Sequence, residues 1–414
     1  MIQAVAERGY MAVTTRELVG LAGVSKRTLY DLFAGKEECF LAAFDLVVDR
    51  AVRRIATAYE GGSDWRARLC GAFDVFTREL DRDPCASRLV LVEALGAGPT
   101  SLARMEQANA RFEAMVSTSL AQAPGNVPVA PILVEGIVAG LARVARVRLL
   151  DGRAGELPEL ASQLLDWALC YRCKSVVRLE RVTRMPLPSR GVPADAADML
   201  GSGTREDSRA RIMRAGLELA ARDGYGAATL EAIVSRARVS RRVFVQQFDD
   251  PQTCFLAAFE LLGEQALALA FDAGRDAADW PGGVYRTVAA LTERLARDEM
   301  FARATFIEIF ALGPAGLPSR ERLVERLAEN LVAAVAPRPG RRQAPSELVL
   351  QASAGAVWGI VHRHVAQARA RQLPVLAGHL TYMLLAPLLG PKRAVDAILD
   401  EHARMLVGAS QSDG

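Results

Sequence analysis

Residues 14–44 read TTRELVGLAGVSKRTLYDLFAGKEECFLAAF, and the last six letters, CFLAAF, recur at residues 254–259, 215 positions further on. At the same offset Gly9-Tyr10 matches Gly224-Tyr225. Because a chance hexapeptide would not bring such matches with it, we interpret the chain as two similar halves. Further matches at this offset are Val24-Ser25 with Val239-Ser240, Phe33 with Phe248, Trp65 with Trp280, and Glu93 with Glu308.

The composition is that of a soluble globular protein. The 414 residues are 51% hydrophobic and 24% charged, and the net charge of +3 does not by itself indicate nucleic acid, so any basic site must be local. Six sparse cysteines fit a reducing cytosol. The start, MIQAVAERGY, has no signal-peptide pattern, and we find no uncharged apolar run long enough for a bilayer. We therefore expect a cytoplasmic protein with no membrane partner.

Both halves have apolar residues at helical spacing, and few runs alternate with period two, so we predict an all-α fold. The stretch MPLPSRGVPADAADMLGSG between the halves is rich in Pro, Gly, Ser and Asp, which is typical of an exposed linker. The predicted domains are a first head at 1–45, a first body at 46–173, a linker at 174–208, a second head at 209–260 and a second body at 261–408.

The first head has the layout of a helix-turn-helix. Thr14 or Thr15 can cap a short helix, Gly23 permits a left-handed turn, and we expect Val24 to fill the corner. Ser25 then caps a second helix, which we expect to bury Leu29 and Phe33. In this layout the second helix enters the major groove of DNA with its N-terminal end first.

The exposed start of that second helix has suitable chemistry for DNA. Lys26 and Arg27 can contact guanine edges or phosphates, the Thr28 methyl can meet thymine, and the Tyr30 hydroxyl can donate to a phosphate. Lys36 opens the next helix, where free amide groups already favour an anion. The candidate DNA-binding residues of this head are Thr15, Ser25, Lys26, Arg27, Thr28, Tyr30 and Lys36.

These residues resemble the DNA-binding region of the TetR family of bacterial transcriptional repressors, over about 45 residues of the first half. The resemblance implies a three-helix DNA-binding head on a larger helical, ligand-sensing body, acting as a homodimer. It also implies that the positions of Lys26, Thr28, Tyr30 and Lys36 touch DNA.

The second head departs from this pattern. Arg238 replaces the turn glycine, Val245 replaces the tyrosine and Pro251 replaces the lysine. Two interpretations stay open: an altered head that reads a different half-site, or a decayed head kept for packing. Candidate DNA-binding residues are Ser240, Arg241, Arg242 and Gln246, the last of which can reach adenine edges.

Each body ends in two apolar helices, which in TetR-like proteins form the bundle of the dimer. Because both sets lie on one chain, we expect an intramolecular pseudo-dimer, with further homodimerisation open. Aromatic side chains in the bodies either fill the core or line pockets for a small apolar or aromatic effector. The candidate ligand-binding residues are Phe73, Phe112, Trp167, Phe306 and Trp358.

Other chemistry has little support. Cys170 and Cys173 lack a second ligand pair, and His362 and His364 point to different helical faces, so we expect no metal, no cofactor and no enzyme activity. The sequence favours a ligand-responsive repressor that binds double-stranded operator DNA with an imperfect palindrome. The alternative is a ligand- or protein-binding module that has lost specific DNA binding.

Overall fold

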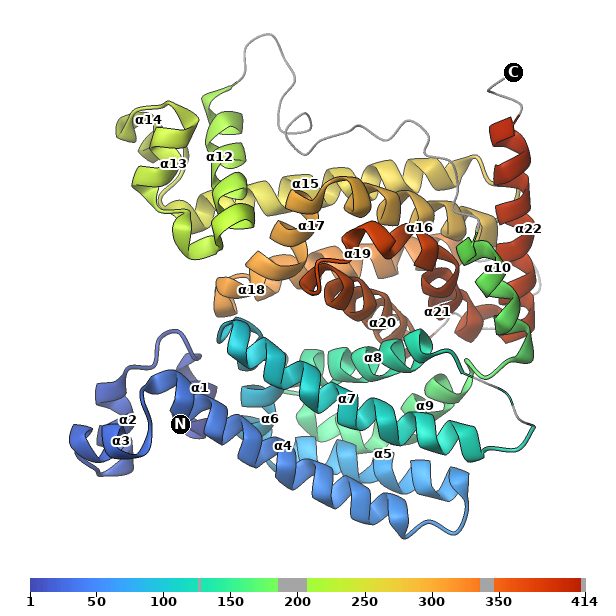
Figure 1. The fold of residues 1–414 in the computed structure, drawn as a ribbon, viewed down its shortest axis with the longest axis horizontal. Helices are drawn as coiled ribbons and strands as arrows, with labels where there is room; N and C mark the ends of the chain where they lie inside the picture. The colour runs from blue at the N-terminus through green and yellow to red at the C-terminus, as the bar shows by residue number, and fades with distance from the viewer. Residues whose placement is uncertain (126, 128, 185–206, 336–345, 411–414) are drawn as a thin grey trace. The chain divides into compact units, whose positions relative to one another are not determined.

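The structure is a computed structural model of residues 1–414, and it describes all of them except 126, 128, 185–206, 336–345 and 411–414. The described residues form helices and no strand, which confirms the all-α prediction (Figure 1). The chain divides into two compact units. The first consists of residues 1–173 with 351–356, and the second of residues 174–350 with 357–414.

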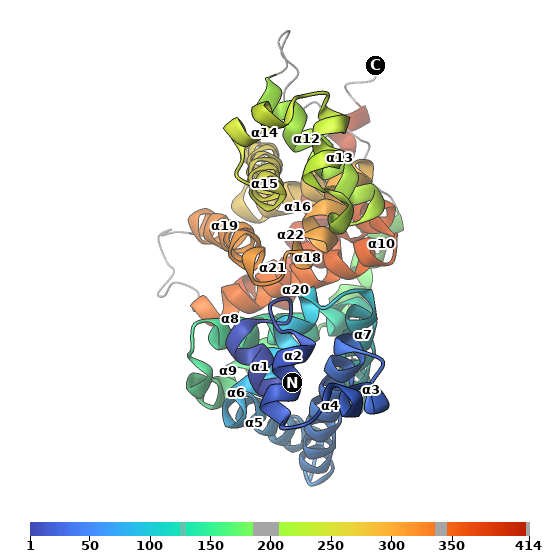
Figure 2. The ribbon, with the colours of Figure 1, turned by 90° about the vertical axis from the view of Figure 1, so that its left-hand side faces the viewer.

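The first unit consists of a head of three short helices and a body of longer ones. The head contains α1 (Ile2–Arg8), α2 (Thr15–Ala22) and α3 (Lys26–Leu32). The long helix α4 (Lys36–Glu60) runs from this head into the body (Figures 1 and 2). The body continues with α5 (Trp65–Arg82), α6 (Pro84–Leu91), η1 (Glu93–Gly96), α7 (Pro99–Gln122), α8 (Pro131–Leu150), η2 (Ala154–Glu156) and α9 (Leu157–Leu169).

The second unit repeats this order. Its head contains α12 (Ser208–Asp223), η4 (Tyr225–Ala227), α13 (Leu230–Ala237) and α14 (Arg241–Gln247). The helices of its body are α15 (Pro251–Arg275), α16 (Trp280–Arg297), α17 (Glu299–Arg303), η5 (Ala304–Glu308), α18 (Ile309–Ala311), η6 (Gly313–Ala315), α19 (Leu317–Val335), α20 (Glu347–Ala366), η7 (Ala370–Leu376), α21 (Ala377–Leu389) and α22 (Pro391–Ser410).

The repeat is visible in the residues that begin the helices. The Asp64 carboxylate accepts from the Arg66 and Ala67 amides at the start of α5, and Asp279 accepts from the Gly282 amide at the start of α16. Asp83 and Asp298 likewise cap α6 and α17. An acceptor at this position satisfies amide groups that the helix itself leaves unpaired, so the two halves start these helices at corresponding residues.

CFLAAF joins each head to its body. Phe40 and Phe44 are buried one turn apart on α4, in a cluster that includes Leu18 and Leu29 of the head and Leu89 of the body. In the second unit Phe255 and Phe259 are buried on α15 in the same way. The run therefore supplies the buried face of the helix that connects head and body.

Residues 174–184 differ from the prediction. They form η3 (Lys174–Arg178) and α10 (Leu179–Arg184), which pack against α21 and α22 in the second unit. Val176, Leu179 and Val182 are spaced three residues apart and are all buried. They form an apolar face that packs on the second unit, although charged residues surround them in the sequence. The linker predicted at 174–208 is wrong for this part, and residues 185–206 lie outside the described residues.

Two helical segments of the described chain, Pro251–Arg275 and Ala370–Leu389, are long and apolar enough to cross a membrane by length and composition alone. Each contains at least one charged side chain, so neither is an uncharged apolar run. Within the fold, 50% of the apolar window of the first and 61% of that of the second is buried. A core helix of a globular protein has these same properties.

Replacing Phe44 by Ala should lower the free energy of unfolding by about 3–5 kcal/mol, because a fully buried aromatic ring is removed. Phe259→Ala should act similarly in the second unit, where its ring is 2% exposed. Leu46→Ala is the control, since this side chain is 64% exposed on the same helix and its loss should change stability by less than about 0.5 kcal/mol. Urea unfolding followed by circular dichroism measures all three, and equal effects of Phe44→Ala and Leu46→Ala would contradict the assignment.

Candidate nucleic-acid interface and ligand pockets

The first head contains the predicted helix-turn-helix. Thr14, not Thr15, caps α2, and it forms a capping box with Glu17. Gly23 ends α2 in the left-handed region, with φ 64° and ψ 28°. The Ser25 hydroxyl then accepts from the Thr28 amide at 3.0 Å and starts α3. Gly23 and Ser25 thereby set the angle between the two helices.

Helix α3 buries Leu29, while Lys26, Arg27, Thr28 and Tyr30 are exposed. These four side chains are on a face that a DNA groove can reach, and their contacts with DNA stay predictions. The expectation for Val24 is wrong. This side chain is 41% exposed and does not fill the corner, where the Val24 amide instead donates to the Val19 carbonyl at 3.0 Å and closes the end of α2.

Lys36 is held in place from within the head. Its ammonium donates to the Tyr10 carbonyl at 3.1 Å and lies 4.3 Å above the centre of the Tyr10 ring. Partial burial lowers the pKa of Lys36. The residue before it, Gly35, offers no side-chain acceptor to the start of α4. Because an ammonium group has three donors, Lys36 and this helix start together can still hold a phosphate.

A buried carboxylate fixes the position of Tyr10. Glu93 of η1 is 4% exposed, and its Oε2 accepts from the Tyr10 amide at 2.9 Å. Its Oε1 lies 3.3 Å from Nε of Arg88. A residue of the body therefore positions the backbone of the head, and Tyr10 in turn positions Lys36.

The same connection exists in the second unit. Glu308 of η5 accepts from the Tyr225 amide at 2.8 Å and pairs with Arg303 at 3.1 Å. The position of Lys36 corresponds to Pro251, whose side chain carries no charge, so Tyr225 has no lysine to position at the start of α15.

The turn of the second head repeats the left-handed geometry of the first, but with a strained non-glycine residue. Arg238 has φ 52° and ψ 46°, in the left-handed region that favours glycine. The Ser240 hydroxyl accepts from the Val243 amide at 3.3 Å and starts α14. Arg241, Arg242 and Gln246 are exposed on this helix, as their proposed role requires.

The electrostatic surroundings of the two heads differ. The Asp250 carboxylate accepts from the Thr253 amide at 2.7 Å and occupies the start of α15. At the matching start of α4, Lys36 is predicted to contact a phosphate. Arg236 is paired with Glu218. Positive charge near α14 comes from Arg238, Arg241 and Arg242, and from Arg209, which donates to the Gln247 carbonyl at 3.0 Å.

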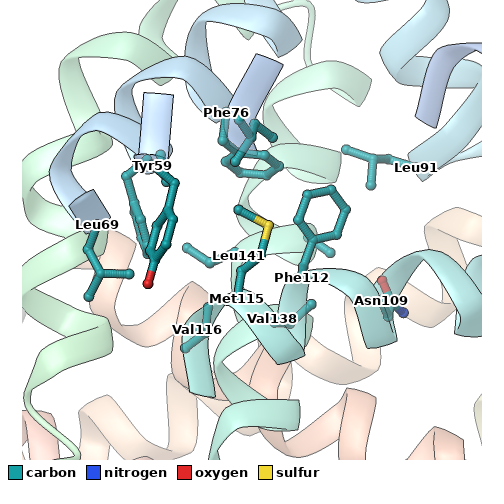
Figure 3. Close-up of a pocket in the computed structure, with 14 residues that line it drawn as sticks. Tyr59, Leu69, Phe76, Leu91, Asn109, Phe112, Met115, Val116, Val138 and Leu141 are labelled. Carbon is teal, nitrogen blue, oxygen red and sulfur yellow. The ribbon is translucent and has the colours of Figure 1, made fainter. Parts of the chain in front are cut away.

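An apolar cavity lies inside the first body, between α4, α5, α7 and α8 (Figure 3). It is lined by the predicted residues Phe73 and Phe112, and it has an empty volume of about 670 Å³ that includes its opening. A second apolar cavity adjoins it, with Phe76, Asn109 and Phe112 in both linings. Trp167 lines neither cavity, because its ring is buried edge-on against Tyr171 at 5.4 Å.

The second body has an apolar cavity at the corresponding place. The predicted residues Phe306 and Trp358 both line it, with their ring centres 4.3 Å apart. The guanidinium of Arg320 lies over the Trp358 ring at 5.1 Å. Four of the five predicted ligand residues therefore border a cavity, and their role in binding stays a prediction.

Two polar residues that line the first cavity, Tyr59 and Asn109, are not among the predicted ligand-binding residues. Both stand among apolar residues at helical spacing, and this contrast is the signal that could have found them. Figure 3 shows them on opposite sides of the cavity, with Phe76, Met115 and Phe112 between them.

The titratable groups singled out earlier do not form a site. Burial raises the pKa of Cys170 to about 12, which keeps its thiol protonated. The ring nitrogens Nδ1 of His362 and His364 contact the backbone carbonyls of Phe306 and Ile360. Over the part of the chain that the structure describes, no group of three or more His, Cys, Asp or Glu side chains could hold a metal ion.

The model of the family described as bacterial regulatory proteins, tetR family, matches residues 2–43 and 212–265, the two heads. A curated relative is the HTH-type transcriptional activator FasR of Mycolicibacterium smegmatis, which is 36% identical over 84 residues. That match covers 20% of this chain and 38% of FasR, so the chain spans well under half the length of this relative.

Two solved structures match parts of the chain. The fatty acid degradation regulator FadR from Bacillus halodurans has a TM-score of 0.39 and 15% identity, over 45% of this chain and 100% of its own. A transcriptional regulator from Rhodococcus sp. Rha1 has a TM-score of 0.33 and 18% identity, over 49% of this chain and 97% of its own.

Arg238→Gly should raise the stability of the second unit by about 1 kcal/mol, because glycine adopts the left-handed region without steric conflict. The reverse change, Gly23→Arg, should destabilise the first unit by a similar amount. Arg236→Gly, inside α13, is the matched control and should be destabilising by about 1 kcal/mol. Thermal unfolding measures these shifts, and a loss of stability with Arg238→Gly would show that its backbone is not strained.

Proposed function

Since the chain belongs to the TetR family of bacterial regulatory proteins, with its DNA-binding head present twice, we propose that it is a DNA-binding transcriptional regulator. We propose further that it is a ligand-responsive, non-enzymatic repressor that acts in the cytoplasm. The observation that carries the proposal is the pair of exposed helices α3 and α14, each set by a left-handed turn and a serine cap.

The partner that fits these surfaces is double-stranded operator DNA, bound by a fused pseudo-dimer. Tyr30 and Lys36 support phosphate contacts in the first head, and Val245 and Pro251 replace them in the second. Because the exposed side chains of α3 and α14 differ, the two half-sites of the operator should differ as well. The proposed operator is therefore an imperfect palindrome.

The proposed effector is a small apolar or aromatic molecule that enters the cavity of the first body. Leu91 lines this cavity and stands two residues before Glu93. Glu93 holds the Tyr10 amide, and the Tyr10 carbonyl holds Lys36. A ligand that displaces the end of α6 would move Lys36 relative to a bound phosphate. The ligand would then bind the free protein and the DNA-bound protein with different affinities.

A second candidate function is a ligand- or protein-binding module without an operator. The observations that favour it are confined to the second head, where Asp250 occupies the helix start and Arg238 strains the turn. Such a module would bind DNA weakly, without sequence preference and with steep dependence on salt.

Selection of bound duplexes from a random DNA pool at physiological salt separates the two candidates. One motif with two unlike half-sites supports the regulator in which both heads read DNA. Two like half-sites would mean that two chains pair through their first heads. The absence of any enriched motif would favour the binding module.

Lys36→Ala and Tyr30→Phe should each weaken operator binding by roughly 1–3 kcal/mol and leave the preferred sequence unchanged, because both side chains are assigned to phosphates. Lys36→Ala should also reduce the slope of log affinity against log salt by about 1. Val245→Ala on α14 is the control, since its side chain has no donor. Fluorescence anisotropy over a salt series measures the effects, and unchanged affinity in both variants would remove these residues from the interface.

Glu93→Ala should weaken operator binding, because it removes the acceptor that positions Tyr10 and thereby Lys36. It should also destabilise the first unit by about 1–3 kcal/mol. The loss of DNA affinity should be smaller in a Lys36→Ala background, as for two residues that act through one contact. Glu308→Ala is the matched control, and its effect should add to that of Lys36→Ala. Additive effects of Glu93→Ala and Lys36→Ala would disprove the coupling.

A further inference from the structure

The cavities of the two bodies are copies of one site. Residues at the same offsets as the sequence repeat line both cavities, 215 positions apart on the earlier helices and 219 apart on α8 and α20. The corresponding pairs include Phe76 with Leu291, Phe112 with Leu327, and Val138 with Val357. The two cavities therefore share matching apolar linings, and they can be compared by the polar groups in which they differ.

The polar group that distinguishes the first cavity is the hydroxyl of Tyr59, at the end of α4. Tyr59 lines the cavity, and its hydroxyl oxygen is buried without a hydrogen-bond partner among the described residues (Figure 3). A buried hydroxyl without a partner is costly, and native proteins rarely keep one unless something else satisfies it. A water molecule needs two to four polar partners, and this lining is almost entirely apolar.

The lining also excludes a charged occupant. None of the side chains that border the first cavity is ionisable at neutral pH, and Asn109 is the other strongly polar one. The nearby guanidinium of Arg68 lies 5.8 Å from the centre of the Tyr59 ring, and it donates to Gln122 and to the Gly62 carbonyl. Arg50 and Glu79 border only the adjoining cavity, where they pair with Asp83 and Arg54. A buried charge with no counter-ion is strongly disfavoured, so an occupant confined to the first cavity must be neutral.

The second cavity has its donor at another place. The position of Tyr59 corresponds to Gly274, which has no side chain to donate. The buried atom without a partner is instead the indole nitrogen of Trp358 on α20, and Trp358 corresponds to Ala139 in the first body. The unpartnered donor therefore lies on α4 in the first cavity and on α20 in the second.

We infer that the cavity of the first body binds an uncharged, largely apolar molecule with an acceptor oxygen, such as a ketone, ester or alcohol, to which the Tyr59 hydroxyl donates. This inference rests on the proposed effector site and names the chemistry that the site selects. The oxygen of the ligand lies at the Tyr59 end, and its apolar part extends between Phe76 and Phe112 toward Asn109. Because the donor of the second cavity is elsewhere, the same molecule fits the second body less well.

The test uses the full chain and three probes of similar length: 2-nonanone, nonanoate and the neutral dye N-phenyl-1-naphthylamine. Displacement of the dye gives the affinity of the other two. We expect 2-nonanone to displace the dye and nonanoate to do so far more weakly. Tyr59→Phe should weaken the binding of 2-nonanone about tenfold, the value of one hydrogen bond, and leave that of the dye unchanged.

The matched control is Trp358→Phe, which removes the unpartnered donor of the second cavity and keeps an aromatic ring. It should leave the affinity for 2-nonanone unchanged. The inference is overturned if Tyr59→Phe has no effect, if Trp358→Phe has the larger effect, if nonanoate binds more tightly than 2-nonanone, or if 2-nonanone does not displace the dye. Circular dichroism checks that both variants fold.

Titration of the same preparations with selected duplex DNA separates this inference from the proposed function. Binding of 2-nonanone that depends on Tyr59, in a chain without sequence-specific DNA binding, would support the ligand site and reject the regulator. Specific DNA binding in a chain that does not recognise 2-nonanone through Tyr59 would reject the ligand site alone.

Discussion

The hydrogen bond between the buried Glu93 carboxylate and the Tyr10 amide is the contact on which the first unit depends. A carboxylate that is 4% exposed is tolerated only because the amide and Arg88 compensate for its lost hydration. That requirement ties the turn between α1 and α2 of the head to η1 of the body. Glu308 meets the same requirement with Tyr225 and Arg303 in the second unit.

The two units share the features that build the backbone and differ in the side chains that we propose to contact other molecules. The serine caps of α3 and α14, the aspartate caps of the body helices and the buried phenylalanines of CFLAAF occur in both units. Tyr30, Lys36 and Tyr59 do not, since Val245, Pro251 and Gly274 replace them. Caps and core residues are constrained by the fold itself, whereas an exposed or pocket-lining side chain can change without unfolding the chain.

Arg238 shows that the left-handed turn is kept even where the residue is not glycine. An arginine at φ 52° is strained, yet the chain keeps the left-handed turn because the following Ser240 cap and the packing of α13 and α14 require it. The second head thus retains the shape of a helix-turn-helix with a different set of exposed side chains. Its shape is consistent with either an altered or a decayed DNA-binding head, and the exposed Arg241, Arg242 and Gln246 favour the altered one.

The sequence by itself determined the all-α class, the two halves, and the turn and Ser25 cap of the first head. These features depend on local spacing, which the order of residues records directly. Only the tertiary structure decided that residues 174–184 pack on the second unit, that Val24 is exposed, and that Phe112 lines a cavity while Trp167 does not. Periodicity places a side chain on the inner face of a helix. Whether that face meets another side chain or an open space depends on distant residues, and so does the absence of a partner for the Tyr59 hydroxyl.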